Sequence, residues 1–201
     1  MSRPAAMVGV AFGSHVNGKR LDDPALSPIF DELDRRGTVV FLHPNIPVCM
    51  GPDIVDMNIG PSLAYLFDTG VTIYRMIFSG MLERYRRLKV IVPHLGGMLP
   101  YLTGRLEEVY GAGRAGKDLP KPPGEYLREL YFDTLINHQP SLRLAKDQFG
   151  ADHLMLDSDY PPGMLPLEQS LRFLEEADLS EAERHQILGA NATRVLGPAS
   201  P

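Results

Sequence analysis

The chain has 201 residues, of which 44% are hydrophobic, and a formal net charge of −5 at pH 7. This length suits one domain with a sizeable core, expected over residues 1–201, and the acidic balance gives no electrostatic case for nucleic acid or an anionic membrane as a partner. The single cysteine, Cys49, excludes an internal disulfide and favours the cytoplasm, and no apolar run reaches the about 18 residues of a membrane span.

Strand-like and helix-like segments alternate along the chain. Short apolar runs typical of buried strands occur at Met7–Phe12, Thr38–Leu42, Lys89–Pro93, Leu130–Thr134 and His153–Ser158. Apolar residues at helical spacing predict helices over Leu26–Gly37, Leu63–Leu88 with a break near Ser79, Pro100–Val109, Leu142–Phe149 and Leu167–Glu176, and a last helical pair after the capping box of Ser180 and Glu183. This alternation favours an α/β fold with a parallel sheet.

Three of the predicted strands lead directly into a side chain that can bind a metal or move a proton. His43 follows VVFL, His94 follows KVIVP, and Asp159 follows HLMLDS. In (β/α) barrels, catalytic groups sit at the carboxyl ends of the strands. Neither GxGxxG nor GxxxxGK[ST] follows any strand, which argues against a nucleotide site. The pattern therefore predicts a barrel-type active face.

Several longer stretches resemble a known family. They are VIVPHLGGMLPYLTGRLEE, LYFDTLINHQPSLRLAKDQFGADHLMLDSDYPPG and ILGANATRVLG. Their order and spacing are similar to the amidohydrolase-related (amidohydrolase 2) family, in its aminocarboxymuconate-semialdehyde decarboxylase-like branch, from Gly9 to Gly197. The resemblance implies a distorted (β/α)8 barrel with one divalent metal, usually zinc. In that family an H-x-H pair on the first strand, a His on the fifth and an Asp on the eighth bind the metal, and a His on the sixth performs acid/base chemistry.

The resemblance assigns roles to four residues of this sequence. His43 becomes the fifth-strand metal ligand, His94 the catalytic histidine and Asp159 the last metal ligand. Arg105 becomes a substrate-binding residue that reaches across a dimer interface to a carboxylate, a task that suits its bidentate fork. The alternative for Arg105 is a helix-surface side chain paired with a neighbouring glutamate such as Glu108.

Two further acidic residues leave alternatives open. Asp157 competes with Asp159, because residues two apart in a strand face the same side, and only the match to S-D-Y-P selects Asp159. Asp133 in YFDT could face the barrel mouth, although a capping or turn role is the preferred interpretation.

The sequence also departs from the family pattern. None of its six histidines forms an H-x-H pair, and the five predicted strands correspond to family strands four to eight. A closed barrel needs about 200 to 250 residues, so the expected fold is an incomplete TIM-like (β/α) barrel, N-terminally truncated relative to the family, with open sheet edges. The missing strands would belong to a longer gene product or to another chain, or the chain is a decayed paralogue.

The implied function is a metal-dependent decarboxylase of a small carboxylated substrate, in which His94 moves a proton. One alternative is a hydrolase or hydratase of the same superfamily, and another is an inactive fragment or a subunit that needs a partner for the missing strands. His43 and Asp159 are two ligands, whereas a catalytic zinc site usually has three from the protein, so zinc binding depends on the absent part. A homo-oligomer, most simply a dimer, is expected.

Overall fold

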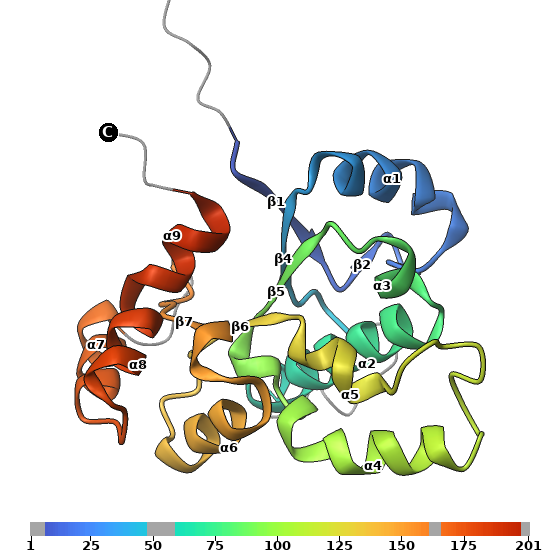
Figure 1. The fold of residues 1–201 in the computed structure, drawn as a ribbon. Helices are drawn as coiled ribbons and strands as arrows, with labels where there is room; N and C mark the ends of the chain where they lie inside the picture. Colours follow the sequence, from blue (N-terminus) through green and yellow to red (C-terminus); the bar gives the residue numbers. More distant parts are fainter. Residues whose placement is uncertain (1–6, 48–58, 161–165, 198–201) are drawn as a thin grey trace, which may run out of the picture.

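The computed structural model describes residues 7–47, 59–160 and 166–197. Its main sheet has five parallel strands in the order β1-β4-β5-β6-β7 (Figure 1). These strands are Gly9–Gly13, Val39–His43, Lys89–Val92, Tyr131–Asp133 and Leu154–Met155. Each strand lies beside the one before it, which is the order of a singly wound (β/α) barrel. The predicted α/β fold with five parallel strands is confirmed.

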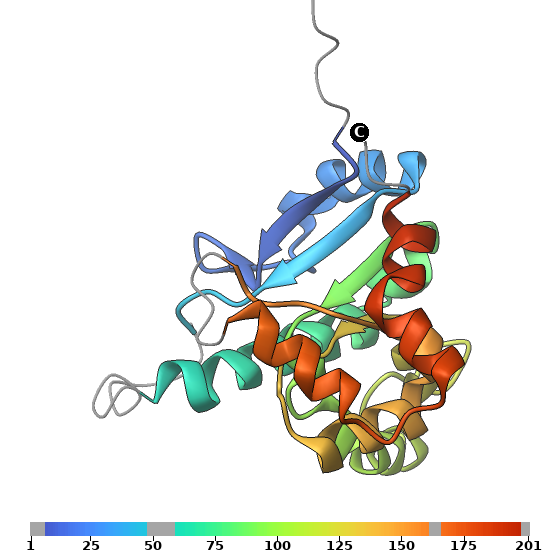
Figure 2. The same cartoon turned by 90° about the vertical axis from the view of Figure 1, so that its left-hand side faces the viewer.

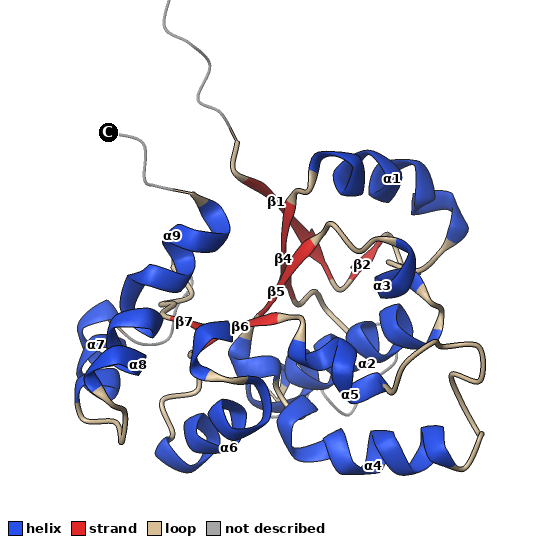
Figure 3. Cartoon of the chain, viewed as in Figure 1, coloured by secondary structure: helices blue, strands red, loops and turns tan. Residues whose placement is uncertain are grey.

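Helices surround the sheet (Figure 3). They are α1 Ser27–Arg36, α2 Tyr65–Phe78, α3 Met81–Arg84, α4 Leu99–Gly111, α5 Pro123–Arg128, α6 Gln139–Phe149, α7 Leu167–Glu175, α8 Glu181–His185 and α9 Asn191–Leu196. The predicted break in the long helix occurs at Gly80, whose φ of 74° lies in the left-handed region and separates α2 from α3. The capping box of Ser180 and Glu183 begins α8 as predicted. In the described ranges, no helix is long and apolar enough to cross a membrane.

Alternate residues of the strands face two different apolar clusters. Val40 and Leu42 of β4 belong to the main core, which packs against α1, α2 and the later helices. Val39 of β4 and Ile91 of β5 point to the opposite face, where Val195 of α9 packs on them. Figure 2 shows α9, in red, beside the sheet. This alternation with period two makes both faces of the sheet apolar, which explains why the strands read as continuous hydrophobic runs.

The second face of the sheet is only partly covered. A hollow of about 370 Å³ lies between the strands and α9, with Val10, Phe41 and Met155 among its walls. In the part of the chain that the structure describes, β1 and β7 each have a strand on one side only. The open edges and the open inner face expected from the sequence are therefore present in these residues.

Three elements differ from the sequence-based expectation. A short hairpin, β2 His15–Val16 and β3 Lys19–Arg20, follows β1 and was not predicted. Helix α5 was also not predicted from the sequence. Strand β7 is shorter than predicted, because the backbone N–H of Leu156 donates to the carbonyl of Ile187 instead of continuing the ladder. Cys49 lies outside the described residues.

Candidate active site

The three predicted strand-end residues meet at one cavity. His43 ends β4, His94 follows β5, and Asp159 lies four residues beyond β7. All three line a cavity of about 390 Å³ at the carboxyl ends of the parallel strands. The remaining walls are Pro44, Pro61, Ser62, Tyr65, Leu66, Leu135, Ile136 and Asn137. A mostly apolar cavity with a few convergent polar groups is the usual form of a small-molecule site.

His43 and Asp159 form the polar centre of this cavity. The Nδ1 atom of His43 lies 3.1 Å from the carbonyl oxygen of Pro44, and its Nε2 atom lies 3.3 Å from Oδ1 of Asp159. Because a carbonyl only accepts, Nδ1 carries the proton that it donates, and neutral His43 then presents a lone pair at Nε2. That lone pair faces a carboxylate oxygen, so a proton or a cation between the two atoms relieves their repulsion.

The donor set of His43 and Asp159 fits two positions of a divalent-metal shell. Imidazole nitrogen and carboxylate oxygen both ligate zinc, and a ligating histidine commonly donates its second N–H to a carbonyl, as His43 does to Pro44. Within residues 7–47, 59–160 and 166–197, no cluster of three or more His, Cys, Asp or Glu side chains could hold a metal. His43 and Asp159 are thus two candidate donors, fewer than the three protein ligands of a usual catalytic zinc site.

His94 lies beside this pair and is half-buried. Its ring centroid is 6.3 Å from that of His43. Burial lowers the pKa of His94, the neighbouring His43 lowers it further, and Asp159 and Asp157 oppose the shift. Its Nδ1 atom is buried without a hydrogen-bond partner among the described residues. A neutral imidazole held next to two polar groups is suited to take up and deliver a proton.

Backbone strain is concentrated around the cavity. His94, Leu95, Asn137 and Asp159 have φ between 49° and 55°, and Asn17 is the remaining non-glycine residue of the described ranges with positive φ. This left-handed conformation costs about 1–2 kcal/mol per residue outside glycine. Such residues persist only where the surroundings hold them, and they cluster at functional sites.

Glycine makes the turn after His94 possible. Gly97 has a φ of 59°, and a Cβ atom there would lie 2.9 Å from the carbonyl oxygen of Leu66. A residue with a Cβ atom would therefore collide with the backbone of α2 at this point. The tight turn keeps this segment close to α2, and Leu66 lines the same cavity as His94.

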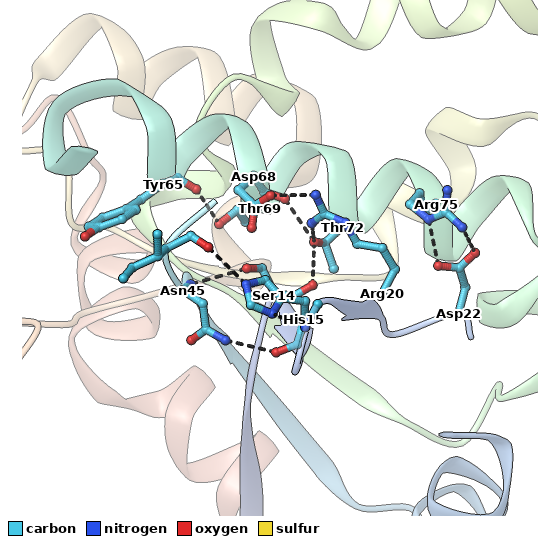
Figure 4. Close-up of polar contacts among 12 residues, drawn as sticks. Ser14, His15, Arg20, Asp22, Asn45, Tyr65, Asp68, Thr69, Thr72 and Arg75 are labelled. Carbon is cyan, nitrogen blue, oxygen red and sulfur yellow. Dashed lines mark hydrogen bonds and ion pairs between the residues drawn. The ribbon is translucent and has the colours of Figure 1, made fainter. Parts of the chain in front are cut away.

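A polar network holds the segment that follows His43 (Figure 4). The backbone N–H of Asn45 donates to Oγ of Ser14 at 3.2 Å, and its Nδ2 donates to the carbonyl of His15 at 2.9 Å. The Nε2 atom of His15 lies 3.0 Å from the carbonyl oxygen of Ile46. These bonds tie the loop after β4 to the loop after β1, so the backbone next to His43 is fixed from two sides.

The same network reaches helix α2 through a buried ion pair (Figure 4). Nη2 of Arg20 lies 2.8 Å from Oδ1 of Asp68, and Nη1 lies 3.3 Å from Oγ1 of Thr72. The Thr72 hydroxyl lies 3.0 Å from the carbonyl of Ser14. The hairpin β2–β3 is thereby attached to α2, the helix whose first turn supplies Tyr65 and Leu66 to the cavity.

The competing residue Asp157 has a different role from Asp159. Oδ1 of Asp157 accepts the backbone N–H of Ser158 at 2.7 Å and of Asp159 at 3.3 Å. The Asp159 carboxylate faces His43, whereas Asp157 lines the inner hollow of the sheet. The geometry separates two residues that strand parity could not separate.

Asp133 is buried at the end of β6, with 1% exposure. Burial raises the pKa of Asp133 to about 7, the charge of Asp157 adds to this rise, and the backbone N–H groups of Leu135, His94 and Leu95 oppose it. Its Oδ1 atom accepts from Leu135 at 3.0 Å, which is the turn role preferred from the sequence, and also from Leu95 at 3.1 Å.

Arg105 lies apart from the cavity. It is on α4, where Nη1 pairs with Oε2 of Glu108 at 2.9 Å and both side chains are largely exposed. This is the helix-surface arrangement weighed as the alternative. The role of Arg105 across a dimer interface concerns a second chain and stays a prediction.

Sequence reasoning did not single out Asn137 and Tyr65, which also line the cavity. Oδ1 of Asn137 is buried without a hydrogen-bond partner among the described residues. The weak sequence indication was the residue type, since asparagine adopts the left-handed conformation more readily than most residues. Tyr65 begins α2, and its position could not be inferred because it depends on how α2 packs across the strand ends.

Comparison with known proteins identifies the family. Residues 3–197 match the sequence profile of the family described as Amidohydrolase. The chain belongs to the amidohydrolase family. It is 36% identical over 197 residues to 2-amino-3-carboxymuconate-6-semialdehyde decarboxylase of Dictyostelium discoideum, which covers 94% of this chain and 53% of that protein. It is 33% identical over 179 residues to 6-methylsalicylic acid decarboxylase of Penicillium expansum, covering 83% and 52%.

Solved structures agree with this assignment. The fold superimposes with a TM-score of 0.87 on 5-carboxyvanillate decarboxylase LigW from Sphingomonas paucimobilis, at 28% identity, covering 94% of this chain and 58% of that one. Decarboxylases with this fold include examples solved with bound manganese. The relatives named here are decarboxylases. The chain spans about half the length of the curated relatives it matches.

Proposed function

We propose that this chain forms part of the active site of a divalent-metal-dependent decarboxylase that acts on a small aromatic or unsaturated carboxylate. The observation that carries the proposal is that His43, His94 and Asp159 line one cavity. Nε2 of His43 and Oδ1 of Asp159 are 3.3 Å apart. The three relatives named above are decarboxylases, which supports the same reaction class.

The apolar walls of the cavity and His94 have different roles in the proposed reaction. Apolar walls such as Pro44, Leu66 and Ile136 accommodate the carbon skeleton of the substrate and exclude water. As the bond to the carboxyl group breaks, the electron pair remains on the substrate carbon and CO2 departs. Neutral His94 takes up a proton from solvent and, as the imidazolium, delivers it to this carbon, which returns the ring to its neutral form. A bound metal supplies charge stabilisation for the developing negative charge.

The metal is proposed to be zinc or manganese, held by His43 and Asp159 together with donors outside the described residues. Zinc suits the nitrogen and oxygen donors, whereas manganese is bound in two solved decarboxylases of this fold. Metal analysis of the purified protein by inductively coupled plasma mass spectrometry distinguishes the two. His43→Ala and Asp159→Ala are expected to lose the metal, and His185→Ala, an exposed histidine on α8, serves as the matched control.

Release of CO2 tests the reaction class. The protein is incubated with 6-methylsalicylate and 5-carboxyvanillate, the acids named for its relatives, and headspace CO2 is measured. His94→Ala is expected to abolish release while retaining the metal, because it removes the proton donor and leaves both ligands. Metal content that stays equal in His43→Ala, Asp159→Ala and His185→Ala contradicts the proposal. So does consumption of substrate by hydrolysis or hydration without release of CO2.

A further inference from the structure

We propose that Asp133 is a positioning residue for His94, holding the strained backbone at His94 and Leu95 by accepting a hydrogen bond from the amide of Leu95. The inference rests on the proposed function, because that function gives His94 its proton-transfer role. Asp133 does not line the cavity of the candidate site, and it acts through the loop that carries His94.

The register of the sheet places Asp133 beneath the His94 loop. Val92 of β5 pairs with Phe132 of β6, so Asp133 is one residue further along, beside the exit of β5 towards His94. Asp133 is buried with 1% exposure and points to the inner face of the sheet. Its carboxylate is therefore within reach of the first backbone amides after β5 and after β6.

One oxygen atom connects two loops of the cavity. Oδ1 of Asp133 accepts the N–H of Leu95 at 3.1 Å, in the loop after β5, and the N–H of Leu135 at 3.0 Å, in the loop after β6. The first loop carries His94, and the second carries Leu135, Ile136 and Asn137 of the cavity wall. Loss of this oxygen frees both loops together.

The backbone at His94 needs such support. His94 and Leu95 are consecutive non-glycine residues in the left-handed region, with φ of 55° and 54°. Their turn satisfies other amides internally, since Gly96 donates to the carbonyl of Pro93 and Gly97 to that of His94. The amide of Leu95 points instead to the Asp133 carboxylate. Two strained residues persist only where the surrounding structure over-determines them, and Asp133 supplies that constraint from the neighbouring strand.

The test distinguishes the hydrogen-bond acceptor of Asp133 from its charge, and the positioning of His94 from a general loss of stability. Asp133→Asn keeps an oxygen acceptor, whereas Asp133→Ala removes it. Asn191→Ala is the matched control, because Asn191 is buried to a similar degree and also bonds to the backbone. Its Nδ2 donates to the carbonyls of Ala151 and Leu154 at 2.8 Å each, at the amino end of β7 and away from the cavity. For each variant, the thermal midpoint, the ring resonance of His94 in 13C-histidine-labelled protein, and kcat and KM for CO2 release are measured. His94→Gln identifies the resonance.

Asp133→Ala is expected to shift or broaden the His94 resonance and to lower kcat about 10- to 100-fold with little change in KM, the penalty for a misplaced catalytic group. Asp133→Asn is expected to retain the wild-type resonance and most of kcat. Asn191→Ala is expected to lower the thermal midpoint alone. If Asp133→Ala does not fold, Asp133→Ser replaces it, because the shorter hydroxyl cannot span both amides.

Two results overturn the inference. One is a lowered thermal midpoint in Asp133→Ala with an unmoved His94 resonance, as in the control. The other is an Asp133→Asn variant that behaves like Asp133→Ala. If the wild-type protein releases no CO2 while Asp133→Ala still displaces the His94 resonance, the positioning role stands and the proposed function fails.

Discussion

Replacing Arg20 by methionine tests how the hairpin after β1 is held to the rest of the fold. Methionine keeps an apolar stem of similar length and removes the guanidinium that lies 2.8 Å from Oδ1 of Asp68. The Arg20 side chain is 12% exposed and that of Asp68 is 0% exposed, so the Asp68 carboxylate would stay buried without its cation. Removing one partner of a buried pair typically costs about 3–5 kcal/mol.

A second arginine–aspartate pair involving helix α2, which also carries Asp68, provides a matched control. Arg75 of α2 pairs with Asp22, which lies just after β3, at 2.8 Å, but 52% of the Arg75 side chain is exposed. Water screens this second pair and replaces its hydrogen bonds, so Arg75→Met is expected to cost at most about 1 kcal/mol. The two variants remove the same chemical group and differ in burial.

Urea unfolding at pH 7, followed by far-ultraviolet circular dichroism, measures both costs. The double variant Arg20→Met with Asp68→Asn is expected to recover part of the stability lost in Arg20→Met, because the buried charge is then gone. Equal costs for Arg20→Met and Arg75→Met would refute the reasoning, since they would mean that burial does not set the strength of the Arg20 pair.

Three further predictions concern single residues. Asp133 stays protonated in the native state up to about pH 7 because burial raises its pKa from 3.8, so the native state binds a proton that the unfolded chain releases. The free energy of unfolding therefore falls as pH rises from 3.8 towards 7, by roughly 4 kcal/mol in total. The urea midpoint of Asp133→Asn should change less with pH over this range than that of the wild type. Phe30→Ala should cost about 3–5 kcal/mol in urea unfolding because Phe30 is 1% exposed, whereas Ile29→Ala, at 46% exposure, should cost far less. Ser180→Ala should lower the free energy of unfolding by about 1 kcal/mol through loss of the α8 cap, and an unchanged thermal midpoint would contradict this.

Some elements missed from the sequence were nevertheless encoded locally. The hairpin β2–β3 turns at Asn17 and Gly18, which both have positive φ. An Asn-Gly pair between two short extended segments is the strongest short-range indication of a hairpin, and it is present in HVNGKR. Helix α5 is different, because its segment is rich in proline and glycine and its stability comes from packing: Tyr126 and Leu127 are buried in the main core.

The sequence by itself determined the positions of the five strands, the apolar character of both faces of the sheet and the polar residues that end its strands. These follow from local patterns: apolar runs of strand length, glycine stops and ligand-type residues after β4, β5 and β7. The match to S-D-Y-P selected Asp159 by resemblance alone, and the tertiary structure supplied the physical reason. Asp157 and Asp159 are equivalent by strand parity, and the left-handed φ of 54° at Asp159 turns its side chain to His43. The burial and raised pKa of Asp133 likewise depend on Asp157 and on the His94 loop, which are distant in sequence, and a local pattern carries no information about such neighbours.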